Sequence, residues 1–367
     1  MSPYEAASSL AEHLWALGSR RVEWARPLTF TYILAMFWIT MFHFVWRHRH
    51  GSWRQYYMGS TAVRLASSPS VRHIGKDVLF VYRLCVFLYC FWSLLDTSIA
   101  TGPSCLRFFT VWNFTALVCF FALGTGLSFS CCRDVAQLRS PPSRVHRAAA
   151  ALHHILLEVQ LPMAAMIALV VWLVLYPYDA MGGAEHPDAT AYRLSQYTNL
   201  TSLTMHAANL IFMLVEFGLD ALHVAPGHMG LVVAWGMLYA LFNGLQAYFT
   251  NDTVYFFTDF TLAKTPLVAV LLTSLMGAIF TSACALSRLK WRLLLGADHP
   301  RNPHAADATG CAACCASEGA APPTDELAGA DSEAGDGGGG WLAGSGRVCD
   351  ASGHDHPSVP YTQFTAR

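Results

Sequence analysis

Four polar side chains, Thr110, Asn113, His206 and Asn209, lie in otherwise apolar stretches of the sequence. Histidine is the side chain most often used to accept or donate a proton in catalysis. Residues three apart share a helical face, which pairs Thr110 with Asn113 and His206 with Asn209. At 1.5 Å per residue, His206 lies about 10 Å and Thr110 about 3 Å from the same end of their helices, a difference that helix tilt can reconcile.

The same four side chains also suit a structural role. A neutral histidine that is hydrogen-bonded to a neighbouring membrane helix contributes about 0.6 kcal/mol on average. A threonine inside a helix commonly donates its hydroxyl proton to the carbonyl four residues earlier. The residue types alone therefore leave a catalytic role and a packing role open.

The composition indicates that these residues lie in a membrane protein. Of the 367 residues, 54% are hydrophobic and 13% are charged, whereas soluble domains carry about 25% charged residues. The apolar residues are gathered into long runs. This pattern excludes a conventional soluble protein, a disordered protein and a nucleic-acid binder. Membrane lipids are the expected partners, no protein partner is indicated, and no metal or cofactor is predicted.

Seven apolar stretches are long enough, or nearly so, to cross a bilayer as helices, which takes about 20 residues. They are 27–46, 78–100, 108–130, 155–176, 199–217, 229–249 and 266–286. These stretches lack the alternating pattern of a membrane β-barrel. The sequence therefore predicts an all-α, polytopic transmembrane helix bundle over residues 27–296.

The remaining segments complete the domain organisation. Residues 1–26 lack the apolar core of a cleavable signal peptide and are expected to form an extracytosolic segment. Residues 297–367 are rich in Gly, Ala, Asp and Glu. Such a composition cannot bury enough apolar surface to fold, so we expect a disordered cytosolic tail.

The distribution of Lys and Arg predicts the orientation of the spans, because cytosolic loops carry an excess of both. Segments on one side of the predicted bundle hold thirteen of these residues and those on the other side hold six. The excess places the amino terminus outside the cytosol and the carboxyl terminus inside it, in the plasma membrane or an endomembrane. The sequons at Asn199 and Asn251 fall on the outer side and are predicted glycosylation sites.

Arg83, Glu158 and Glu216 are charged residues inside the predicted spans and need partners there. A charge in the hydrocarbon costs at least about 2.5 kcal/mol on the insertion scale. All three residues lie near the cytosolic ends of their spans, at similar depth. We therefore expect Arg83 to pair with Glu216 or with Glu158.

Three short segments, in this order, resemble signature motifs of the rolling stone family of multi-pass membrane proteins. They are 108–115 (FFTVWNFT), 206–209 (HAAN) with Glu216 downstream, and 254–260 (VYFFTDF). That family is similar, more remotely, to the androgen-induced proteins, which are intramembrane hydrolases of branched fatty-acid esters. The resemblance implies that Thr110 is a nucleophile and that His206 is its base.

Three classes of function remain. The sequence favours a non-catalytic protein of the rolling stone type, with a role in membrane organisation, adhesion or fusion. The alternative is an intramembrane hydrolase of fatty-acid esters that uses Thr110 and His206, with Asn209 or Asp96 orienting the imidazole. A receptor or transporter is disfavoured, because the third span ends without an Asp/Glu-Arg-Tyr-type sequence and no internal repeat is found.

Overall fold

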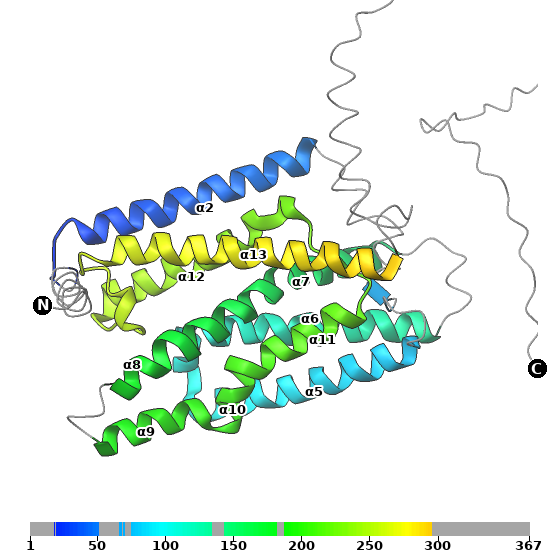
Figure 1. Cartoon of the computed structure of the whole chain (residues 1–367), viewed down its shortest axis with the longest axis horizontal. Coiled ribbons are helices and arrows are strands. Elements are labelled where there is room, and N and C mark those ends of the chain that lie inside the picture. Colours follow the sequence, from blue (N-terminus) through cyan, green and yellow to red (C-terminus); the bar gives the residue numbers. More distant parts are fainter. Residues whose placement is uncertain are drawn as a thin grey trace, which may run out of the picture. The chain divides into compact units, whose positions relative to one another are not determined.

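The computed structural model describes residues 18, 20–50, 66–67, 69, 75–133, 143–181 and 187–295. The predicted disordered tail, 297–367, and most of the predicted amino-terminal segment, 1–26, lie outside these residues. The described elements are helices (Figure 1). The long ones are α2 (Ala25–His50), α5 (Lys76–Thr101), α6 (Phe109–Arg133), α7 (Arg144–Val170), α11 (Asn209–Leu219), α12 (Met229–Thr250) and α13 (Thr265–Leu295). The short ones include α8 (Tyr176–Met181), α9 (Pro187–Thr198) and α10 (Leu200–Leu203).

Among the described residues, seven helical segments are long and apolar enough to cross a membrane. This confirms the predicted all-α bundle and identifies a multi-pass membrane protein. The fourth segment runs over Arg144–Met181, well beyond the predicted stretch 155–176. Its start is set by Ser143, whose hydroxyl accepts a hydrogen bond from the His146 N–H, and by four consecutive alanines at 148–151, which are strong helix formers.

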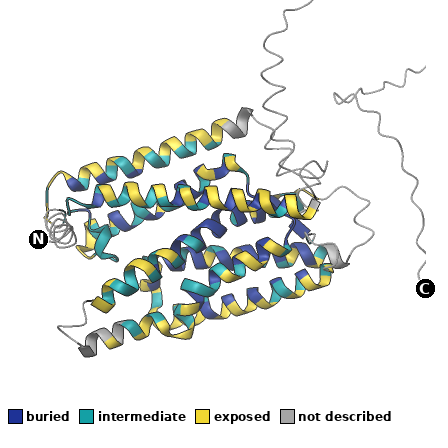
Figure 2. Cartoon of the chain, in the orientation of Figure 1, coloured by how far each residue is buried: buried dark blue, intermediate teal, exposed yellow. Residues whose placement is uncertain are grey.

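Helix α7 lies at the centre of the bundle, where it packs against α6, α11, α12 and α13. In the most apolar part of the segment that contains α7, half of the residues are buried. The corresponding fraction for α2 is 11%, because α2 lies at the edge of the bundle, where it packs on α12 and α13. Figure 2 shows the same gradient, with buried residues along α7 and α6 and exposed residues along α2.

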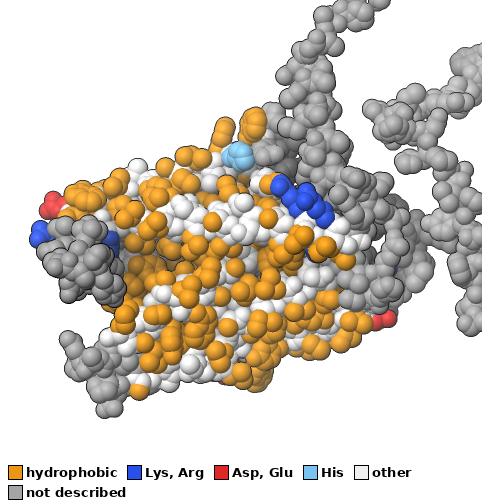
Figure 3. Space-filling model, in the orientation of Figure 1, with side chains coloured by type: hydrophobic (Ala, Val, Ile, Leu, Met, Phe, Trp, Pro, Cys, Tyr) orange, Lys and Arg blue, Asp and Glu red, His pale blue; other side chains and the backbone are white. Residues whose placement is uncertain are grey.

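The outer surface of the helices is apolar. Large hydrophobic side chains such as Ile99, Trp92 and Phe42 are more than two-thirds exposed. Figure 3 shows hydrophobic side chains across the visible face, with the charged side chains near its ends. Such a surface is suited to contact with lipid chains, since soluble monomers rarely expose apolar patches of this extent.

Candidate functional site

A cavity of about 830 Å³ lies between the helices at the end of the bundle where α5 ends and α6 begins. The ends of α5 and α7, the start of α6, helices α8 to α10 and the segment after α12 all contribute to its lining. Thr110 and His206 both line it. The three segments that resemble the rolling stone motifs, far apart in the sequence, therefore meet at one cavity.

Thr110 lies in the first turn of α6, where its side chain is 8% exposed. The Phe109 N–H at this helix start donates a hydrogen bond to the Tyr255 hydroxyl, with 3.2 Å between the nitrogen and the oxygen. The hydroxyls of Thr110 and Tyr239 lie near that hydroxyl, and the Tyr239 hydroxyl donates to the Arg107 carbonyl at 2.7 Å. Tyr255 therefore joins the segment after α12 to the start of α6.

Burial raises the pKa of Tyr255 above its usual value, against the hydrogen bonds from its neighbours, which lower it. Its side chain belongs to the segment between the sixth and seventh spans. The phenol consequently stays protonated at neutral pH and keeps a proton to donate into the cavity.

His206 lies in a π-helical turn, Thr204–Ala208, between α10 and α11. Its Nδ1 is 2.9 Å from the hydroxyl oxygen of Ser202, four residues earlier. A hydrogen bond at Nδ1 fixes the ring and leaves Nε2 for other chemistry. A second π-helical turn, Val171–Leu175, also contributes to the lining. Single π turns inside α-helices frequently occur at functional sites.

Two carboxylates accept hydrogen bonds from residues that lie close to His206 in the sequence. The ring of Tyr197 is 6.4 Å from that of His206, and its hydroxyl donates to Oδ2 of Asp179 at 2.7 Å. The Thr201 hydroxyl donates to Oδ2 of Asp96 at 3.2 Å. Of these groups, sequence reasoning singled out only Asp96. Ser202 could have been found, because position i−4 lies on the neighbouring turn of the same face.

Asn209 begins α11 directly after the π turn and is buried. Its Oδ1 accepts a hydrogen bond from the N–H of Leu210 at 2.6 Å. The wider π turn breaks the regular spacing that placed Asn209 on the face of His206, and Asn209 is not part of the described cavity lining. Its supporting role stays a prediction. The structure gives the imidazole a different partner, Ser202.

The two predicted glycosylation sites are exposed. Asn199 caps α10, because its Oδ1 accepts from the Ser202 N–H at 2.8 Å. Asn251 follows α12 in a left-handed conformation, with φ of 52°. Asn199 lines the cavity, and Asn251 lies three residues before Val254, which also lines it. Glycosylation itself stays a prediction.

Arg83 is the centre of a second, fully buried polar cluster near the start of α5. It bonds Glu216 through Nε and Nη2, at 2.8 and 2.6 Å, and Asp220 through Nη2 at 2.8 Å. Its Nη1 donates to the Ser128 hydroxyl and to the Ala66 carbonyl, both at 2.7 Å. The expected pair of Arg83 with Glu216 is confirmed. Both hydrogen bonds to Glu216 end on Oε1, and its Oε2 is buried without a hydrogen-bond partner.

Glu158, the other expected partner of Arg83, bonds a different group. Its Oε2 is 2.6 Å from Nδ1 of His228, and its Oε1 accepts from the Ala225 N–H at 2.9 Å. It thereby fixes the chain between α11 and α12, where Asp220 through Val224 are buried. The Val224 N–H donates to the Ser287 hydroxyl of α13 at 3.1 Å.

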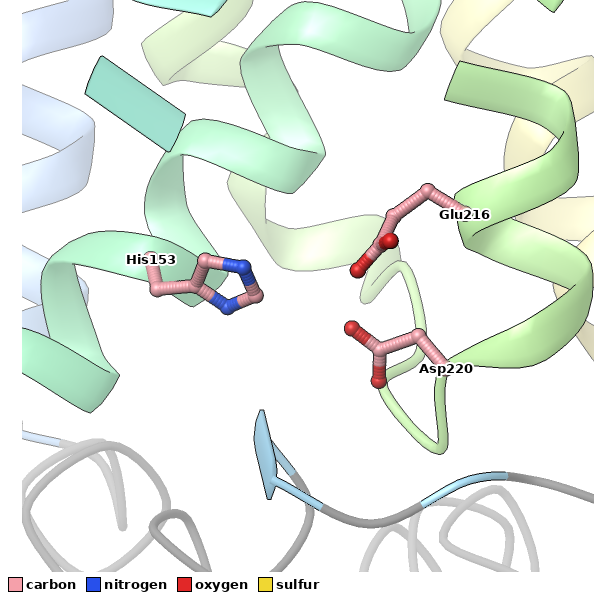
Figure 4. Close-up of side chains that lie close together, drawn as sticks. All are labelled: His153, Glu216 and Asp220. Carbon is pink, nitrogen blue, oxygen red and sulfur yellow. The ribbon is translucent and has the colours of Figure 1, made fainter. Parts of the chain in front are cut away.

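His153 faces Glu216 and Asp220 across this cluster (Figure 4), with ligand atoms of all three within 4.8 Å of one another. These side-chain types can ligate a metal ion. The Arg83 guanidinium, however, already forms ion pairs with both carboxylates and would repel a cation bound between them. A divalent cation would add uncompensated charge to a group of side chains that has no access to water, which is strongly unfavourable. The cluster is therefore best understood as a structural ion-pair network.

No family model, curated protein or solved structure matches the chain. The comparisons therefore identify no family, and the resemblance to the rolling stone proteins depends on the three motifs alone.

Proposed function

We propose that this protein hydrolyses lipid esters within the membrane, with Thr110 as nucleophile and His206 as base. The observation that carries the proposal is that both residues line one cavity of about 830 Å³ in a chain surrounded by lipid. This volume is within the range of small-molecule sites, about 300–1,000 Å³. Apolar side chains from α7, α12 and α13 make up much of the lining, which suits an acyl chain.

The proposed reaction has two steps. His206 Nε2 takes the proton of the Thr110 hydroxyl as the oxygen attacks the ester carbonyl carbon, and the same proton then passes to the departing alcohol. Water, deprotonated by His206, next attacks the acyl-threonine, and His206 returns that proton to the departing Thr110 oxygen. The products are the alcohol, the fatty acid and the free enzyme. Tyr255, protonated and beside Thr110, is suited to donate a hydrogen bond to the oxyanion that forms in each step.

The hydrogen bonds favour this proposal over a purely structural role for His206. A histidine whose role is to join helices would form a hydrogen bond with a neighbouring helix. Asn113 does so, because its Oδ1 accepts a hydrogen bond from Trp235 Nε1 of α12 at 3.0 Å. The described hydrogen bond of His206 goes instead to Ser202 on its own run of helix. Asn113 thus fits the packing role, and His206 fits the base.

The test is hydrolysis of a fluorogenic long-chain fatty-acid ester by the purified full chain in uncharged detergent. T110A and H206A are expected to lower the rate at least 100-fold, because nucleophile and base act as a unit, while T110S retains activity. T115A and H43A are matched controls. Thr115 is exposed and bonds only the carbonyl of Val111, one turn back on α6, and His43 is exposed on α2.

Each variant is compared at equal amounts of monodisperse protein, so that loss of folding is not taken for loss of chemistry. A wild-type protein without esterase activity would overturn the proposal. So would a T110A protein that hydrolyses the ester at the wild-type rate.

A further inference from the structure

The charged side chains in the cavity lining all have one sign. Among the lining residues that the structure describes, Asp96 and Asp179 are acidic, and Lys and Arg do not occur. The two carboxylates reach the cavity from different elements, α5 and α8. Each is one hydrogen-bonded neighbour away from the segment that carries His206, through Thr201 and Tyr197.

The cations at this end of the bundle belong to residues outside the lining. Arg107 forms an ion pair with Asp252. Lys264 lies against the ring of Phe256, with its Nζ 6.0 Å from the ring centroid. Among the residues that the structure describes, no ion pair joins either side chain to Asp96 or Asp179.

The lining also distinguishes the two ends of an amphiphile. Met166, Val170 and Leu272 are examples of the apolar part, which comes from α7, α12 and α13. The polar part comes from the end of α5 and from residues 196–206. An ester with its acyl chain among the long helices would place its alcohol portion, the headgroup, beside Asp96 and Asp179.

Aromatic rings complete the polar part. Tyr197 lines the cavity, and so do Tyr178 and Phe256, which stack on each other with 3.8 Å between their centroids and so cover one face of each of these two rings. Carboxylates combined with aromatic faces are the groups that recognise quaternary ammonium ions, since the π face and the carboxylate both attract positive charge.

We propose that the cavity selects by headgroup charge, binding long-chain esters of cationic, choline-type alcohols best, uncharged esters less well and anionic lipids poorly. This inference rests on the proposed function, because it assumes that the cavity holds the ester. The charge of the lining would also favour release of the fatty-acid product. Hydrolysis converts a cationic or neutral ester into a fatty carboxylate, which the acidic lining repels, so the product leaves the site that bound the substrate.

The test measures binding without hydrolysis. Three ethers with the same hexadecyl chain, which cannot be hydrolysed, carry a choline, a glycerol or an oxyacetate headgroup. Each displaces tritiated hexadecylglycerol from the purified full chain in uncharged detergent. The oxyacetate ether is expected to bind at least tenfold more weakly than the choline ether, and the difference should shrink in high salt, because Asp96 is exposed.

The double variant D96N/D179N should reduce that ratio to less than threefold. Asparagine keeps an oxygen that can accept the hydrogen bonds of Thr201 and Tyr197, so the variant changes charge with little change in shape. D77N is the matched control, because it removes an exposed carboxylate from the first turn of the same helix α5, far from the cavity. It should leave the ratio unchanged.

The outcomes separate this inference from the proposed function. Equal binding of the oxyacetate and choline ethers, or a ratio that D96N/D179N leaves unchanged, overturns the headgroup selection. Selective binding by a protein that hydrolyses no ester overturns the proposed hydrolysis and leaves the selection standing. Absence of saturable binding of the tritiated ether overturns both.

Discussion

Replacing Arg83 with methionine should destabilise the helix bundle more than replacing any exposed arginine. Methionine keeps the length of the aliphatic stem and removes the charge. The variant R83M leaves the carboxylates of Glu216 and Asp220 buried without their ion-pair partner, and it removes the donors that bond Ser128 and Ala66.

The magnitude follows from burial. Arg83, Glu216 and Asp220 are each 0% exposed, and removing one partner of a buried pair costs about 3–5 kcal/mol. At about 2–4 °C per kcal/mol for a folded region of about 150–250 residues, the thermal midpoint should fall by about 6–20 °C. R107M is the control. The pair of Arg107 with Asp252 is 35% and 59% exposed, and exposed pairs contribute about 0–1 kcal/mol.

The assay measures the temperature at which half of the detergent-solubilised protein is lost from the monodisperse peak in size-exclusion chromatography. All variants are heated at the same rate, because such unfolding is usually irreversible. The double variant R83M/E216Q should recover part of the loss, since it removes one of the two uncompensated carboxylates. An R83M protein with the midpoint of R107M would refute the reasoning.

Three further predictions concern packing, topology and the tail. Gly124→Ala should lower the same thermal midpoint by several degrees, because a Cβ there would come within 2.7 Å of Nε2 of His153; an unchanged midpoint would contradict the observed packing. If the cavity end of the bundle faces the lumen, Asn199 and Asn251 carry glycans in a eukaryotic host, and each Asn→Gln change should remove one enzymatically cleavable mobility shift; a glycan acquired by a sequon engineered at the opposite end would reverse the topology. Deletion of 297–367 should leave expression and monodispersity unchanged, since that stretch has no apolar periodicity with which to pack, and an aggregated truncation would show that it contributes to the fold.

Within the ion-pair cluster, the contact between Arg83 and Glu216 could be predicted from the sequence. Arg83 and Glu216 are charges at equal depth in apolar runs, and the cost of leaving either unpaired made their contact expected. Asp220 lies beyond the predicted span 199–217 and had no reason to be buried. Its burial depends on the chain between α11 and α12 folding back into the bundle, held there by Glu158 and Ser287. These contacts between distant segments leave no local pattern in the sequence.

The candidate site shows where helical periodicity misleads. Regular helical spacing predicted that Asn209 lies beside His206. In the structure His206 belongs to a π turn, its imidazole contacts Ser202, and the Asn209 side chain accepts a hydrogen bond from the backbone of Leu210. A π turn depends on packing around it and has no reliable sequence signature. The cavity is also a property of how helices from both halves of the chain diverge, which hydropathy does not encode.

The two ends of the bundle differ in a way that relates stability to function. At the end near Arg83, buried charges are neutralised and the chain between α11 and α12 is held by side chains of α7 and α13. At the other end the helices separate around an open cavity, and two of them contain π turns. Sites that must admit a ligand contribute little packing energy of their own, so rigidity has to come from elsewhere in the fold. The cluster around Arg83 supplies it, because it fixes the far ends of α5 and α11, helices that lead to Asp96 and His206 in the cavity.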